Sequence, residues 1–202
     1  MTQTLATVRA HLRSHFAEAG IDAEPDAASV TFLGTEAIEV LRFHSGAGGV
    51  VHYVSLGCSR HPMVDPTEVG ADPVRGPRAE VVLRLRDLGR VNGLARSLAM
   101  VAATPAVEGV VLTADALIDL GSPLWAWPSG PAPFTAVLLG RSDIPDLPLE
   151  PPRDPVCFLS AIPITATEAA WVRLKGAEAM RHAWRTDGVD VLDPNRRAVQ
   201  PD

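Results

Sequence analysis

The chain has 202 residues, of which 47% are hydrophobic and 21% are charged. This balance is typical of a folded globular domain and excludes a chain that is disordered throughout. A formal net charge of −6 excludes the positive field that nucleic-acid binding requires. No apolar stretch reaches the roughly 18 residues of a transmembrane helix, and the N-terminus lacks the apolar block of a signal peptide. We therefore expect one domain over residues 1–202 in the cytoplasm, which binds neither a membrane nor nucleic acid.

The first part of the chain is predicted to form a helix followed by strands. Apolar residues recur at spacings of three and four over residues 5–19, which predicts an amphipathic helix with one buried face. The acidic segment 22–29 is predicted to be a loop. The glycine-rich run Gly46–Gly49 is predicted to be a hairpin turn. Runs of β-branched and aromatic residues predict three strands, over residues 30–33, 38–43 and 50–56.

The middle of the chain combines a long irregular segment with the clearest strand pattern. Residues 57–78 hold four prolines and three glycines, and a loop of this length in a compact domain is typical of function. Residues 79–86 alternate between apolar and other side chains, which predicts a strand with one face in the core. A helix is predicted to start at Asn92 and to stop at Thr104, because the next residue is a proline.

The C-terminal part predicts three more strands and one long helix. The strands are expected over residues 107–113, 134–139 and 156–162. The proline-rich stretch 144–155 is predicted to be an extended connection. Thr165 and Glu168 have the spacing of a helix capping box, and the helix that they open is expected to continue to about Arg185. Because strands and helices follow one another without a regular rhythm, we predict the α+β class.

Cysteine and histidine residues provide the main enzymatic alternative. Cys58 and Cys157 are too few for a disulfide scaffold. Cys58 lies three residues before His61, so the two could form a nucleophile and its base in a hydrolase or transferase. His11 and His15 lie one helical turn apart, but no third metal ligand is close in sequence. Phosphate-binding loops and dinucleotide-binding motifs are absent from the sequence. We expect no catalytic residue, cofactor or metal, and keep the Cys58–His61 enzyme as the alternative.

Polar residues on two predicted strands indicate a binding groove. Strand alternation places Glu80 and Arg84 opposite the apolar stripe of their strand, where their charges would face a ligand. Tyr53 and Ser55 lie on the less aliphatic face of another strand, and the long loop follows it directly. A groove between polar strand faces and a long loop suits another polypeptide. The residues expected to contact this partner are Tyr53, Ser55, Arg60, His61, Glu80 and Arg84.

Several segments of the chain resemble the Suppressor of fused family. His52–Ser59 resembles its His-Tyr-x-Ser-x-Gly-x-Ser strand and turn, and Glu80–Leu85 resembles its Glu-Leu-Thr-Phe-Arg-Leu strand. Further similar segments, in the family's order, are Gly93–Arg96, Val156–Leu159, Ile164–Glu168 and Asp193–Arg197. The order and the gaps agree from about residue 30 to about residue 200, so the resemblance covers most of the chain.

The resemblance implies the fold of the family's N-terminal domain, with a mixed, mostly antiparallel central sheet and packed helices. It also implies a protein-binding role without catalysis. In the animal member, two domains clamp a short extended segment of a transcription factor, and this chain resembles only the first domain. Glu80 matches an acid of that groove, whereas Arg60 stands where the animal protein has another acid.

The resemblance leaves the partner open. Bacterial relatives are thought to act as immunity proteins that neutralise toxins, and the many Ala, Arg and Pro residues with few Lys indicate a bacterial source. The partner would then be another protein, such as a toxin. A second copy of this chain is the other possibility, with Trp125 and Trp127 at the interface between copies.

Overall fold

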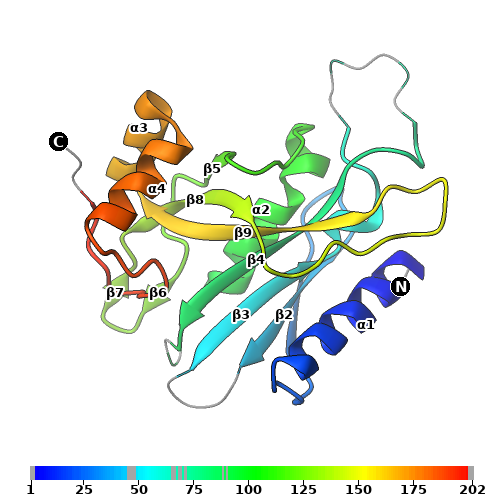
Figure 1. The fold of residues 1–202 in the computed structure, drawn as a ribbon, viewed down its shortest axis with the longest axis horizontal. Helices are drawn as coiled ribbons and strands as arrows, with labels where there is room; N and C mark the ends of the chain where they lie inside the picture. Colours follow the sequence, from blue (N-terminus) through cyan, green and yellow to red (C-terminus); the bar gives the residue numbers. More distant parts are fainter. Residues whose placement is uncertain are drawn as a thin grey trace.

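The computed structural model describes residues 3–44, 49–64, 67, 70, 72–87, 89 and 91–199. Its centre is a seven-stranded sheet with the order β1-β2-β3-β4-β9-β8-β5 (Figure 1). The strands of this sheet are β1 (Asp26–Val30), β2 (Ile38–His44), β3 (Val50–Leu56), β4 (Arg78–Arg86), β5 (Leu117–Asp119), β8 (Phe134–Arg141) and β9 (Val156–Thr165). A small separate hairpin is formed by β6 (Ala126–Trp127) and β7 (Gly130–Pro131). β4 and β9 run parallel and the other described pairs antiparallel, which confirms the predicted mixed sheet.

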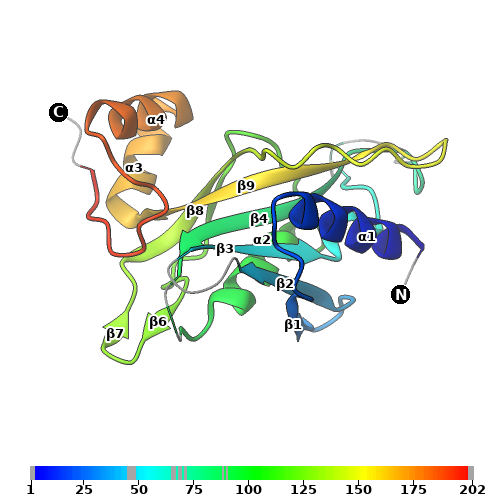
Figure 2. The ribbon, with the colours of Figure 1, turned by 60° about the horizontal axis from the view of Figure 1, so that its bottom comes forward.

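Helices cover both faces of this sheet. The described helices are α1 (Gln3–Glu18), α2 (Leu94–Glu108), α3 (Ala166–Lys175), α4 (Ala177–Thr186) and the short 3-10 helix η1 (Cys58–Arg60). α1 lies on one face, α2 lies on the other, and α3 and α4 pack together beside one end of β8 and β9 (Figure 2). Strands and helices are therefore mixed, as the α+β prediction requires.

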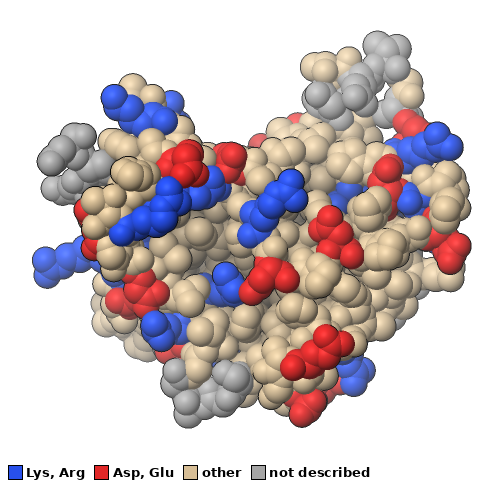
Figure 3. All heavy atoms as spheres, in the orientation of Figure 1, with Lys and Arg blue, Asp and Glu red and all other residues tan. Residues whose placement is uncertain are grey.

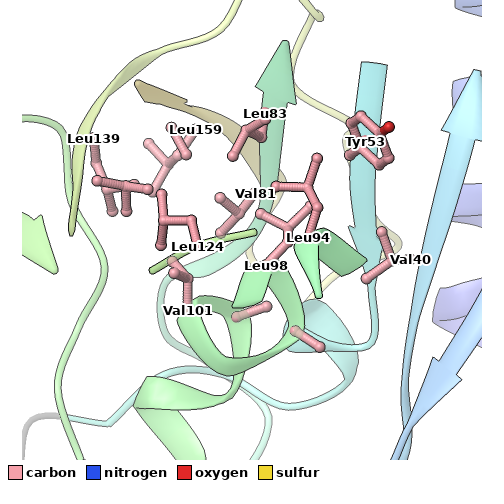
Figure 4. Packing of buried hydrophobic residues seen from close by; sticks show 14 of the residues in the cluster. Val40, Tyr53, Val81, Leu83, Leu94, Leu98, Val101, Leu124, Leu139 and Leu159 are labelled. Carbon is pink, nitrogen blue, oxygen red and sulfur yellow. The ribbon is translucent and has the colours of Figure 1, made fainter. Parts of the chain in front are cut away.

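Strand β4 explains why the protein has two layers of core. Its alternation turns Val81 and Leu83 toward Leu94 and Leu98 of α2 (Figure 4). The residue between them, Val82, belongs to a second cluster that α1 covers. All three β4 side chains are at most 1% exposed. The second face of the predicted strand is thus also buried, which the pattern of residues 79–86 did not indicate.

The first helix and five of the strands confirm their predictions. Leu5, Val8, Leu12 and Phe16 are buried along one side of α1, and the Phe16 ring stacks on Phe43 of β2 at 4.1 Å between centroids. β2, β3, β8 and β9 contain the predicted segments, and β4 begins one residue earlier than predicted. The turn predicted at 46–49 falls mainly on residues 45–48, which lie outside the described residues.

The first edge strand was predicted at the wrong place. The predicted loop 22–29 contains most of β1, and the predicted strand 30–33 keeps only Val30. Residues 26–29 are exposed, so they carry no apolar alternation that could announce a strand. Pairing with β2, from Asp26 opposite Arg42 to Val30 opposite Ile38, defines β1 instead.

Helix α2 runs past the proline at which it was predicted to stop. Pro105 has no N–H to donate to the carbonyl of Val101, four residues earlier. The Thr104 hydroxyl donates to this carbonyl at 2.8 Å, so the carbonyl keeps a partner. The helix therefore continues to Glu108, and the strand predicted over 107–113 does not form. Asn92 pairs with Ala126 in an isolated bridge and does not cap the helix.

The predicted C-terminal helix is two helices. Thr165 caps α3 as predicted: its hydroxyl accepts from the Glu168 N–H at 3.3 Å, and the Glu168 carboxylate accepts from the Thr165 N–H at 2.9 Å. At Gly176 the backbone adopts φ 88° and ψ 166°, which ends α3 and starts α4. The single helix that was predicted to continue to about Arg185 is therefore interrupted at Gly176, because glycine permits a sharp change of direction.

Candidate functional site

Glu80, the predicted partner-contacting acid, lies inside the protein. It is 0% exposed, so the expectation that its charge faces a ligand is wrong. Its carboxylate accepts hydrogen bonds from the Gly57 N–H at 2.8 Å and the Ser59 N–H at 3.0 Å. The Ser59 hydroxyl donates at 2.6 Å, and the Ser55 hydroxyl is a further donor. Glu80 therefore holds the turn that connects β3 to η1.

The turn itself depends on glycine. Gly57 has a φ of 151°, and a Cβ at this position would come within 3.2 Å of the Ala37 carbonyl oxygen and of Ile38. A side chain here would push the turn away from β2 and pull the Gly57 N–H from Glu80. Arg78 supports the same turn from behind, because its guanidinium donates to the carbonyls of Ser59 and Arg60 at 2.9 and 3.0 Å.

The structure does not bring the other predicted strand residues together with this turn at the surface. Tyr53 is 7% exposed and belongs to the core under α2, and Ser55 is 0% exposed. Arg84 lies opposite His52 and pairs with Asp143 at 2.9 Å. The prediction of a groove between polar strand faces is therefore wrong, because helices cover both faces of the sheet. Apolar residues on both faces of residues 50–56 were the signal that could have shown this.

Arg60 and His61 do meet at the surface, beside a hollow that we call the Arg60 pocket. The guanidinium of Arg60 donates to the Ala37 carbonyl at 3.0 Å and pairs with Glu36 at 3.4 Å. His61 Nε2 lies 2.8 Å from the same Glu36 carboxylate. The hydrogen bond to His61 is the main influence that lowers the pKa of Glu36, and the Arg60 charge adds to it.

The walls of the Arg60 pocket are mostly apolar. Its volume is about 380 Å³, and it opens between the turn before β2, η1 and the last part of α2. Ile38 and Met63 are buried in its wall, and Val64 is 37% exposed at its edge. The pocket therefore offers an apolar hollow with charged groups at its rim.

The surroundings of Cys58 disfavour the thiolate that a nucleophile requires. Burial raises the pKa of its thiol well above the usual range, and the nearby Glu80 charge raises it further. Reactive thiols need cationic surroundings that lower this pKa. His61, the proposed base, is bound to Glu36.

A second hollow, which we call the edge groove, lies on the other side of the turn at residues 32–36. It has a volume of about 540 Å³ and is lined by this turn, α2 and β5. Three exposed apolar residues line it: Leu33 at 105%, Val107 at 60% and Val110 at 36% exposure. Contiguous exposed apolar residues mark interaction sites more often than scattered ones do.

Strand β5 presents its backbone to the edge groove. All five residues from Ala116 to Leu120 line the groove, although side chains of successive strand residues point to opposite faces. The groove therefore lies along the edge of the strand. The Leu139 N–H donates to the Ala116 carbonyl and the Leu120 N–H to the Thr135 carbonyl. In an antiparallel ladder the residues between these positions, Leu117 and Asp119, direct their backbone groups away from β8.

The remaining candidates lie elsewhere. Trp125 is 1% exposed, so it cannot form an interface between copies by itself; Trp127 stacks edge-on against it. The part of the chain that the structure describes contains no group of three His, Cys, Asp or Glu placed to hold a metal. None of its helices is long and apolar enough to cross a membrane. On the face seen in Figure 3, acidic and basic side chains are interspersed.

Comparisons with known proteins agree on one family. The family model described as Suppressor of fused protein (SUFU) matches residues 34–197. A SUFU homologue from Neisseria gonorrhoeae FA 1090 has a similar structure, with a TM-score of 0.64 and 18% identity over 98% of this chain and 97% of its own. No curated protein matches the chain.

Two further solved structures are similar. One is described as the Sufu–Fu complex, with a TM-score of 0.64 and 15% identity over 96% of this chain and 91% of that chain. The other is Drosophila Suppressor of Fused, with a TM-score of 0.62 and 15% identity over 95% of this chain. This chain spans 50% of the Drosophila protein. At these identities the likeness is one of fold.

Proposed function

Because the chain belongs to the Suppressor of fused family, whose model matches residues 34–197, we propose that it is a non-enzymatic domain that binds an extended segment of another protein. The observation that carries this proposal is the edge groove, where an open strand edge borders exposed apolar side chains. A strand edge with unpaired backbone groups is a template for another chain.

Strand addition uses both parts of the edge groove. Leu117 and Asp119 would exchange backbone hydrogen bonds with the partner segment, which supplies affinity without regard to sequence. Every second side chain of the segment would enter the groove beside Leu33 and Val107. Removing one such apolar side chain from water contributes about 1.5–3 kcal/mol, so two or three of them give the segment a sequence preference.

Site-specific photocrosslinking tests this proposal. A photoreactive phenylalanine analogue replaces Val107 in the groove, and in a matched control it replaces Leu174, which is 75% exposed on α3 and outside both hollows. We expect the Val107 position to capture a defined protein in the source cells and the Leu174 position to capture none of it. Equal capture at both positions would contradict a site in the edge groove.

Substitutions then measure the contribution of the groove. Val107→Glu and Leu33→Glu place a charge at exposed positions, so the fold should persist. We expect each to weaken binding of the captured protein by about tenfold or more, because a charge would be desolvated against apolar side chains. Unchanged affinity in both variants would move the site away from the groove.

We further propose that the partner is a toxin and that the chain is a cytoplasmic bacterial immunity protein. The family membership and the residue composition support this finer statement. Co-expression tests it: the wild-type chain should protect cells from the captured protein, and Val107→Glu should not. A captured protein that does not harm cells when expressed alone would contradict the immunity role while leaving protein binding intact.

The enzymatic alternative makes a different prediction about Cys58. A catalytic thiolate would react quickly with iodoacetamide near neutral pH, whereas the raised pKa of Cys58 predicts slow alkylation. Cys58→Ala provides the matched control, since it leaves Cys157 as the background thiol. Fast alkylation that depends on Cys58 and His61 would favour the hydrolase or transferase.

A further inference from the structure

We infer that the Arg60 pocket is an acid-selective subsite, which binds an apolar side chain of the partner segment together with a neighbouring Asp or Glu. This inference rests on the proposed function, because it assumes that a polypeptide segment is the ligand. It adds the chemical class of the segment and the residues that select it.

Charge at the rim is the first part of the argument. Among the described residues, Glu36 is the acid that both Arg60 and His61 contact, at 3.4 and 2.8 Å. The other nearby acid, Glu80, is buried, and its oxygens accept hydrogen bonds from the serines and amides of its turn. Arg60 is the permanent cation of this rim and shares Glu36 with the His61 ring, so an acid of the partner segment would bring a second carboxylate to Arg60.

Arg60 can accept this second carboxylate. A guanidinium has five N–H donors, and the described contacts of Arg60 are the Ala37 carbonyl and Glu36. Its side chain is 13% exposed, whereas His61 and Glu36 are 73% and 60% exposed. A partly buried guanidinium binds carboxylates more strongly than a fully solvated one, because water screens it less.

The apolar wall selects the neighbouring side chain. Ile38, Met63 and Val64 line the hollow, and Ala103 and Ala106 of α2 close it on the other side. Cys58 belongs to this wall as a neutral thiol. A volume of about 380 Å³ is at the small end of ligand sites, so it suits one side chain such as Leu or Phe rather than a cofactor.

The position of the pocket connects it to the edge groove. Both hollows border the turn at residues 32–36, and Ala103 of α2 lines both. A segment added to β5 can therefore continue past this turn to the Arg60 pocket. The partner segment then has two parts, an alternating apolar stretch for the groove and an acid beside an apolar residue for the pocket.

Selection of peptides tests the inference directly. A phage-displayed library of random dodecapeptides is selected on the wild-type protein and on Arg60→Glu. We expect wild-type peptides to be enriched in Asp or Glu next to an apolar residue, and Arg60→Glu peptides to carry Lys or Arg at that position. The same enriched sequences from both proteins would overturn the inference.

Two further variants separate recognition from a structural role. For one selected acidic peptide, Arg60→Gln should weaken binding by about tenfold, because it removes the cation. Glu36→Gln should strengthen binding severalfold, because it removes the acid that competes with the peptide. Loss of structure would weaken binding in both variants, so the opposite directions are specific to charge recognition. Arg13→Gln, on the exposed side of α1, is the matched control and should change nothing.

Failure of the inference and failure of the proposed function give different results. Peptides whose binding depends on Val107 but not on Arg60 or Glu36 would overturn the acid-selective pocket and leave strand addition in place. Peptides that bind Val107→Glu as well as the wild type would contradict the edge groove itself.

Discussion

Two buried glutamates organise different parts of this protein. Glu80 and Glu168 are both 0% exposed, yet their partners differ in charge. Among the described residues, Glu80 accepts from neutral hydroxyl and amide groups of residues 55–59. Glu168 also receives the guanidinium of Arg196, at 2.7 and 3.0 Å from its two oxygens. The partners of Glu80 are neutral groups of one turn, whereas Glu168 is paired with a cation that is far away in the sequence.

The two carboxylates therefore have different structural roles: Glu80 fixes the form of one turn, and Glu168 joins separate segments of the chain. Glu80 joins groups that lie close in space and fixes the local form of the turn that carries Arg60. Glu168 joins three segments: it caps α3 at Thr165, accepts from the Trp184 indole at 3.2 Å and holds Arg196 near the C-terminus. The first should matter for the Arg60 pocket, and the second for the attachment of the last segment to the sheet.

Removing Glu80 should have the largest effect. Glu80→Ala leaves four buried donors without their acceptor, and each costs about 1–3 kcal/mol. We expect a loss of about 4 kcal/mol or more, measured by urea unfolding. Glu178→Ala, at an exposed ion pair, is the control. A loss below about 1 kcal/mol would mean that water replaces the carboxylate at the turn.

Breaking the buried pair should cost somewhat less. Arg196→Met leaves Glu168 charged and buried, which costs about 3 kcal/mol. The double variant Glu168→Leu/Arg196→Met removes both charges and should recover part of that loss. The loss in the free energy of unfolding is measured for the double variant and for each single variant. If the double variant loses more than the two single variants together, Glu168 and Arg196 do not stabilise the protein as a pair.

The pair of Glu168 and Arg196 should also make stability depend on pH. Burial raises the pKa of Glu168, but hydrogen bonds and charge from Arg196 and the Thr165 N–H outweigh burial, so its pKa is lowered. A lowered pKa contributes stability above the unfolded-state value near 4.5, which is lost as the pH falls through the folded-state value. Arg196→Met should therefore move acid unfolding, followed by circular dichroism, to higher pH. An unchanged midpoint would contradict the role of Arg196.

The cap at Thr165 should give the smallest effect. Thr165→Ala removes the hydroxyl that accepts from the Glu168 N–H, which costs about 1 kcal/mol. Thermal unfolding of this variant and of Thr165→Ser, which keeps the hydroxyl, measures the difference. Equal loss in both variants would assign the effect to packing of the methyl group.

The spacing of apolar residues predicted the elements in which one regular pattern runs through the whole segment. Residues 79–86 and the buried side of α1 repeat at the spacing of a strand and of a helix, and both formed. Periodicity failed where a single local interaction decides. The Thr104 hydroxyl lets α2 pass Pro105, and backbone pairing alone makes a strand of the exposed residues 26–30.

The candidate site was predicted only in part. Arg60 and His61 lie at a pocket, as a functional loop implies, but Tyr53, Ser55 and Glu80 are buried. Alternation assigns a side chain to a face of a strand, and it says nothing of what covers that face. The edge groove was missed because its apolar residues come from a turn, a helix end and a short strand. Val107 and Val110 belong to the segment 107–113, which was predicted to be a strand.

The parallel pairing of β4 and β9 affects the order in which the protein assembles. Arg78 lies opposite Val156, 78 positions later in the chain, whereas β1 to β4 pair with their sequence neighbours. Contacts between distant positions close large loops and form slowly. During synthesis the first four strands can assemble early, while the exposed edge of β4 waits for β9. In that interval a central strand is open to other chains, so the nascent protein is most exposed to aggregation just before its last quarter emerges.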